Sequence, residues 1–166
     1  MPQTWFDNTG LYQKYGIDQT IPMAGGEYRN DAALREIEFK ITLSSVPLAT
    51  GTIVPGTDNI FMPAGMFIEE VQVVADVLAT GATAVLNLGL IRTDRTTEID
   101  FDGLLTAAPL ANIDTAGERV TYTKGVAGAG PLIGTVTANV GHFVADYDTA
   151  AFTAGVITVR VRYRKL

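Results

Sequence analysis

The C-terminal stretch TAGVITVRVRYRKL (153–166) decides the fold class, because from Val159 on it alternates between apolar and basic residues. The two sets are Val159, Val161 and Tyr163 against Arg160, Arg162 and Arg164. Successive side chains of an extended strand point to opposite faces, so this stretch predicts a strand with one face on a core and an arginine ladder on the other. Four of the twelve basic residues lie in the last seven positions of a chain whose net charge is -6.

The same period of two recurs upstream and predicts an all-β chain. Residues 35–43 (REIEFKITL) alternate cleanly, and residues 68–79 place Val71, Val73, Ala75 and Val77 on one face. Further strands are expected at 50–54, 84–92, 119–125, 132–140, 142–147 and 156–165. Residues 93–103 are polar and loop-like, and residues 103–113 have a short helix-like spacing that Pro109 limits. Short strands separated by Gly-, Asp- and Thr-rich connections favour an antiparallel β-sandwich or jelly roll.

The first 35 residues differ from the rest and predict an extended, irregular N-terminal arm, followed by one sandwich domain at 36–166. This arm shows no sustained helical or strand period and carries the single Trp. A short helix near 31–37, capped by Asn30 or Asp31, is also expected. Large aromatics give much contact area, so the arm's candidate protein contacts are Trp5, Phe6, Tyr12 and Tyr15.

Composition limits the function classes. Only 18% of the residues are charged, against about 25% in an average soluble domain, while 47% are hydrophobic. Part of the surface is therefore expected to contact another protein. The acidic balance disfavours nucleic acid as a partner. No signal peptide or membrane-spanning helix is expected.

Catalytic and metal-binding patterns are weak. The chain has no Cys and one His, His142, and its only serines, Ser44 and Ser45, lack a nucleophile-elbow motif. The acidic residues Asp94, Glu98, Asp100 and Asp102, with a second pair at Asp146 and Asp148, suggest calcium binding or a carboxylate-dependent hydrolase as alternatives to solvated turns. We expect no catalytic residue, cofactor or metal.

The arginine ladder allows three interpretations. Basic residues on the wet face of a strand pair with acidic neighbours, here the Glu36/Glu38 or Glu69/Glu70 sets, or they guard an edge strand. Alternatively, Arg160, Arg162 and Arg164 dock on an acidic protein partner. The third interpretation, nucleic-acid binding, needs a net attractive field that this chain lacks.

Three segments resemble structural proteins of tailed bacteriophages: PAGMFIEEVQVVADV (63–77), ATGAT with AVLNLGL (79–90), and FTAGVITVRVRY (152–163). The chain from about residue 36 onward is similar in strand cadence to capsid cement, or decoration, proteins. This resemblance implies a jelly-roll or β-sandwich body without enzyme activity or cofactor. It also implies a dimer or trimer that binds the major capsid protein on the virion exterior after synthesis in the host cytoplasm. A tail, neck or glycan-binding head-fibre component is the alternative.

Overall fold

The computed structural model describes residues 3–6, 12–15, 34–48, 52–54, 57, 59–81 and 83–165. The chain divides into two units, residues 1–30 and 31–166. Within the predicted arm, β1 (Gln3–Phe6) and β2 (Tyr12–Tyr15) pair as an antiparallel two-stranded ladder. The described residues contain no α-helix, and no helix among them is long and apolar enough to cross a membrane.

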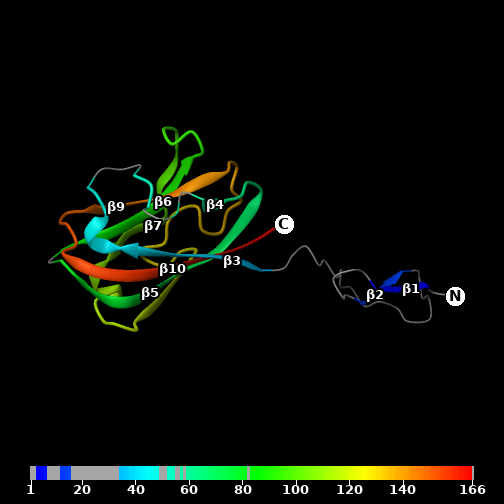
Figure 1. Cartoon of the computed structure of the whole chain (residues 1–166), viewed down its shortest axis with the longest axis horizontal. Coiled ribbons are helices and arrows are strands. Elements are labelled where there is room, and N and C mark those ends of the chain that lie inside the picture. The colour runs from blue at the N-terminus through cyan, green and yellow to red at the C-terminus, as the bar shows by residue number, and fades with distance from the viewer. Residues whose placement is uncertain are drawn as a thin grey trace. The chain divides into compact units, whose positions relative to one another are not determined.

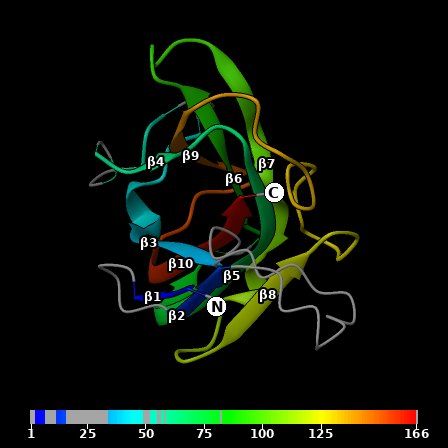
Figure 2. The same cartoon turned by 90° about the vertical axis from the view of Figure 1, so that its right-hand side faces the viewer.

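The second unit is a sandwich of two four-stranded antiparallel sheets (Figures 1 and 2). One sheet has the order β3-β10-β5-β8 and the other β4-β9-β6-β7, which are the lower and upper layers of Figure 2. The strands are β3 (Arg35–Thr42), β4 (Phe61–Met62), β5 (Met66–Thr80), β6 (Val85–Arg92), β7 (Glu98–Pro109), β8 (Arg119–Thr123), β9 (Gly141–Asp148) and β10 (Ala154–Lys165). Single 3-10 turns follow β3 and β7, at Leu43–Ser45 and Leu110–Asn112.

The strand order is that of a jelly roll. The first strand of the sandwich pairs with the last, β4 with β9, β5 with β8 and β6 with β7. Such pairing results when one long antiparallel ribbon is wound into two facing sheets. The predicted fold class is therefore confirmed.

The core lies between the two sheets and is apolar throughout. From β10, Ile157, Val159 and Val161 are fully buried. Across the sandwich, the rings of Phe39 on β3 and Phe143 on β9 lie 4.6 Å apart. Burying each such side chain contributes about 1.5–3 kcal/mol to folding, so the inward half of every alternating strand stabilises the sandwich.

Two irregularities in β5 change which side chains face the core. Register shifts against β10 leave Glu69 and Asp76 without a cross-strand partner, as β-bulges do. The first bulge lets Ile68 and Val71, three positions apart, both be fully buried. The second reverses the alternation, so Val77 is 50% exposed although the sequence places it with the core-facing valines.

Other local predictions are wrong for reasons that lie in tertiary pairing. The helix expected at 31–37 is strand from Arg35 onward, because β10 pairs with this segment, and residues 31–33 lie outside the described residues. The segment 98–109 is the strand β7 instead of a loop and a helical turn. Residues 132–140 form turns with one isolated bridge, Phe67 to Val136, instead of a strand. At 52–54, Ile53 forms only an isolated bridge, to Val144.

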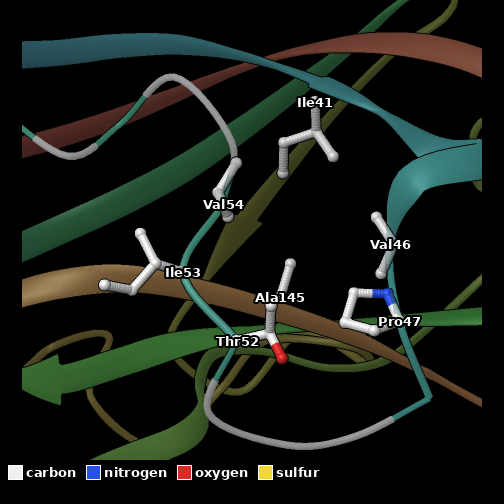
Figure 3. Close-up of a pocket in the computed structure, with 7 residues that line it drawn as sticks. All are labelled: Ile41, Val46, Pro47, Thr52, Ile53, Val54 and Ala145. Atoms are coloured by element: carbon white, nitrogen blue, oxygen red, sulfur yellow. The ribbon is translucent and has the colours of Figure 1, made fainter. Parts of the chain in front are cut away.

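A small apolar pocket marks where the two sheets meet beside β3 (Figure 3). The side chains of Ile41, Val46 and Pro47 lie on one side, and Thr52, Ile53, Val54 and Ala145 on the other. The pocket is too narrow to admit a water molecule and is lined by apolar surface alone. It is therefore a packing seam that holds no ligand.

Gly89 on β6 is required by a close approach of β7. A Cβ at this position would overlap the backbone of Asp100 and Phe101. We therefore expect Gly89→Ala to lower the free energy of unfolding by about 3 kcal/mol, the range of severe overpacking. Chemical denaturation measures the change.

Gly117→Ala is the matched control. Gly117 has a φ of 86° and no neighbouring atom within 4 Å of a built Cβ. Only backbone strain is introduced there, which costs about 1–2 kcal/mol. Equal losses for the two variants would contradict the close approach at Gly89.

Candidate interaction surface

The predicted arginine ladder lies on the outer face of the sheet β3-β10-β5-β8. Its register places Arg160 between Glu38 on β3 and Gln72 on β5, and Arg162 between Glu36 and Glu70. Val159 and Val161 alternate with these arginines and are fully buried, so the outward direction of the arginines follows from the pleat. The strand β10 therefore has the two faces that its sequence predicts.

Each arginine finds a carboxylate within the chain. Arg160 Nε donates to Glu38 Oε2 at 2.6 Å, and its Nη1 lies 3.5 Å from Gln72 Oε1. Arg162 bridges the sheet, because Nε donates to Glu36 Oε2 at 2.8 Å and Nη1 donates to Glu70 Oε1 at 2.6 Å. The immediate acidic neighbours of Arg160 and Arg162 therefore belong to their own sheet, as the first interpretation of the ladder expects.

The bulge in β5 supplies the partner for the last arginine. Glu69 is the extra residue of the bulge, so Glu69 and Glu70 both lie on the same face as the arginines. Glu70 pairs with Arg162, and Glu69 forms an ion pair with Arg164. The Arg164 guanidinium also lies 5.5 Å from the centroid of the Phe67 ring, a cation–π distance. The sequence shows the Glu-Glu pair but not the bulge that makes both carboxylates usable.

The ladder continues toward the other end of the sheet with a lysine and an aspartate. Lys40 Nζ lies 2.9 Å from Asp76 Oδ2, and the Thr158 hydroxyl donates to the same oxygen at 2.7 Å. These two contacts lower the pKa of Asp76 below its usual value. Asp76 is the residue of the second bulge, so both bulges of β5 present a carboxylate to this face.

The electrostatic result is a nearly self-neutralised surface. The hydrogen bond that Arg160 donates to Glu38 raises the pKa of Arg160, and those that Arg162 donates to Glu36 and Glu70 raise the pKa of Arg162. Because the arginines are paired, they present no unpaired cationic stripe to phosphate groups. The outer face of this sheet is therefore nearly neutral, although the chain as a whole has a net charge of -6.

The same face is hollowed beside the start of β3. An open depression of about 470 Å³ is lined by Leu34, Glu69, Glu70, Arg162 and Arg164. Leu34 is 57% exposed, so the depression combines an apolar wall with paired charges. Of the seven predicted contact residues, the structure places Arg162 and Arg164 here, and Arg160 on the same face.

The four aromatic contact residues of the arm lie on β1 and β2. Phe6 pairs with Tyr12, Trp5 with Gln13, and Gln3 with Tyr15 in the antiparallel register. Their side chains lie outside the described residues, so their role as contacts stays a prediction.

The acidic residues of the sequence serve turns and strand kinks. Asp94 accepts hydrogen bonds from the amides of Thr96 and Thr97 and from the Thr97 hydroxyl, which closes the β6–β7 turn. Burial and the neighbouring Asp102 carboxyl raise the pKa of Asp100 to about 6. Among the described residues, no three His, Cys, Asp or Glu side chains are grouped to hold a metal ion.

Asn87 organises the second acidic pair, a role that the sequence analysis missed. Its Nδ2 donates to Asp146 Oδ1 at 2.8 Å and to Asp148 Oδ2 at 2.9 Å. Its Oδ1 accepts the amide of Ala107, which has a left-handed φ of 48°. Asp146 is buried, and this burial raises its pKa. This cluster fixes a kink in β7.

The structure does not assemble His142 and the serines into a catalytic site. His142, at the start of β9, is buried against the Phe61 ring with centroids 4.5 Å apart. Ser44 and Ser45 lie in the 3-10 turn after β3. Two residues beyond this turn, the Pro47 carbonyl accepts a hydrogen bond from the amide of Tyr147, near the far end of β9 from His142. The Ser45 hydroxyl donates to the Thr42 carbonyl at 2.7 Å.

Comparisons with known proteins place the fold. No protein-family model matches the sequence, and no curated protein sequence matches it. Among solved structures, a chain of the cyanophage Pam1 capsid asymmetric unit is similar, with a TM-score of 0.55 and 16% identity over 91% of this chain and 98% of that chain. A chain of the capsid of Ralstonia phage GP4 is similar, with a TM-score of 0.50 and 17% identity over 88% and 89% of the two chains.

Removing Arg162 tests the bridge across the sheet. We expect Arg162→Met to lower the melting temperature by a few degrees, because Glu36 and Glu70 lose their shared partner while the side-chain stem is kept. High salt should reduce the difference, since it screens half-exposed charges. Arg119→Met, at an exposed position of β8, is the control, and an equal effect there would contradict the bridge.

Asp100 predicts a pH dependence of a definite sign. Its folded-state pKa of about 6 lies above the unfolded value of 3.8, so stability falls as the pH rises between these values. We expect Asp100→Asn to stabilise the fold at pH 7.5 by about 1–2 kcal/mol, after discounting for solvent screening. At pH 3, where both forms are uncharged, the gain should vanish.

Asp94→Asn is the control with the opposite sign. Hydrogen bonds hold the pKa of Asp94 well below its usual range, so its contribution is present above pH 4 and is lost as the pH falls. Urea denaturation across this pH range measures both variants. A gain at Asp100 that does not change with pH would contradict the assignment.

Proposed function

We propose that this chain is a structural protein of a tailed-phage virion, a cement or decoration protein that binds the exterior of the major capsid protein shell. One observation carries the proposal. The fold matches chains from two phage capsid structures over nearly the whole of both chains. The likeness therefore extends over the whole sandwich and is not limited to one motif within a larger protein.

The surface supports a binding role. Only 18% of the residues are charged, and the charges of the outer face of β3-β10-β5-β8 neutralise one another. A shell presents the same docking site many times, so modest contacts per copy suffice for stable attachment.

The proposed contacts are of two kinds. Trp5, Phe6, Tyr12 and Tyr15 provide large aromatic surface in the N-terminal arm. The second kind of contact is made by the arginine ladder, Arg160, Arg162 and Arg164. These arginines stay paired with their own glutamates, and charged groups of the partner bind beside the existing ion pairs. The partners are the major capsid protein and further copies of this chain, and the chain is made in the host cytoplasm before it joins the virion.

The number of copies per virion tests the proposal. Quantitative gel densitometry of purified phage particles, relative to the major coat protein, should give a near-stoichiometric ratio. A few copies per particle would indicate a tail, neck or head-fibre component instead. Absence from particles would refute any virion role.

The arm is tested on capsids that lack this protein. We expect combined alanine substitution of Trp5, Phe6, Tyr12 and Tyr15 to abolish binding to such capsids while the melting temperature of the sandwich stays unchanged. Leu48→Ala, at a side chain 65% exposed on the sandwich, is the control and should bind normally. Unchanged binding by the arm variant would show that the arm is not the contact.

A further inference from the structure

The strand β3 forms one edge of its sheet (Figure 1). Its eight residues pair with β10 on one side, and within the described part of the chain no strand pairs with its other side. Such an edge presents a row of unpaired backbone donors and acceptors, and proteins usually shorten it or cover it. An edge of this length is therefore a candidate site for pairing with another strand.

Three of the four charged side chains of β3 lean away from this edge. Glu36 and Glu38 reach toward β10, where they bond to Arg162 and Arg160. Lys40 crosses β10 and pairs with Asp76 on β5. Charges on an edge strand can block a second strand, but here ion pairs hold them above the outer face of the sheet, where they remain charged. The backbone edge of β3 is left uncovered by these side chains.

We propose that β3 pairs antiparallel with β3 of a second copy of this chain, with Phe39 opposite Phe39 on the twofold axis. This register pairs the strand from Glu36 to Thr42. It places Glu38 opposite Lys40 of the second copy, and the twofold symmetry repeats this pair of opposite charges. On the inward face, Ile37 lies opposite Ile41, so apolar side chains also match.

The charge pattern of β3 selects this register among its neighbours. Only shifts by an even number of residues keep the core face inward. The next such register in one direction pairs Glu36 with Lys40 twice but places Glu38 opposite Glu38 on the axis, and the next in the other direction places Lys40 opposite Lys40. Like charges directly opposite one another are destabilising. The Phe39-centred register is therefore the one of these three without a like-charge pair, and this charge complementarity identifies a second copy as the partner.

Charge reversal tests the charge pairing between the two β3 strands in the isolated protein. Lys40→Glu places like charges opposite each other at both symmetric positions, and we expect it to weaken the dimer by about tenfold or more in analytical ultracentrifugation. Arg119→Glu reverses a charge on β8, the other edge of the same sheet, and should leave the dimer unchanged. A monomeric wild-type protein at every concentration, or equal effects of the two variants, would overturn the proposal.

Cysteine pairs test the same register without charge repulsion, because the chain has no native Cys. A mixture of the Glu38→Cys and Lys40→Cys proteins should form a disulfide-linked dimer under mild oxidation, whereas either protein alone should not. Thr121→Cys, exposed on β8, should not cross-link with Lys40→Cys. Absence of the 38–40 cross-link in a dimeric mixture would overturn the register. Neither assay involves a capsid, so this proposal stands or fails independently of the proposed function.

Discussion

The sandwich depends on the placement of its last strand between its first and third. The strand β10 pairs with β3 along one side and with β5 along the other, and its inward valines are fully buried. Without β10, β3 would have no strand among the described residues to pair with, and β5 would lose its longest pairing. The first and last strands of the sandwich would then no longer be joined. These pairings join residues far apart in the sequence, so we expect folding to be slow relative to proteins with local contacts.

The outer side of the same strand decides the character of the surface. An arginine ladder seen in isolation indicates a cationic stripe, but β3 and β5 place carboxylates within hydrogen-bond distance of Arg160 and Arg162. An exposed ion pair adds little stability by itself, whereas a connected set across three strands also fixes their register. The chain thus gains a polar face that is nearly neutral, in contrast to its acidic total charge.

The sequence predicts correctly which residues of a strand are buried where the strand alternates regularly. It predicts this wrongly where pairing with a neighbouring strand introduces a bulge or extends the strand. The burial of β3, and of β10 from Val159 to Arg164, follows the alternation of the sequence, so the inward and outward residues there are those that the sequence indicates. In β5, the bulges at Glu69 and Asp76 reverse the alternation, and the exposed Val77 follows from pairing with β10. Residues 98–103 are polar in sequence, yet β6 pairs with this segment and makes it part of a strand.

The sequence by itself determined the all-β class, the two faces of β10 and the absence of thiol chemistry, because these follow from residue type and a period of two. Only the tertiary structure decided which carboxylates meet the arginines, since partners such as Glu36 and Arg162 are brought together by strand order and register. The free edge of β3 was likewise decided there, because a strand is an edge only in relation to its neighbours.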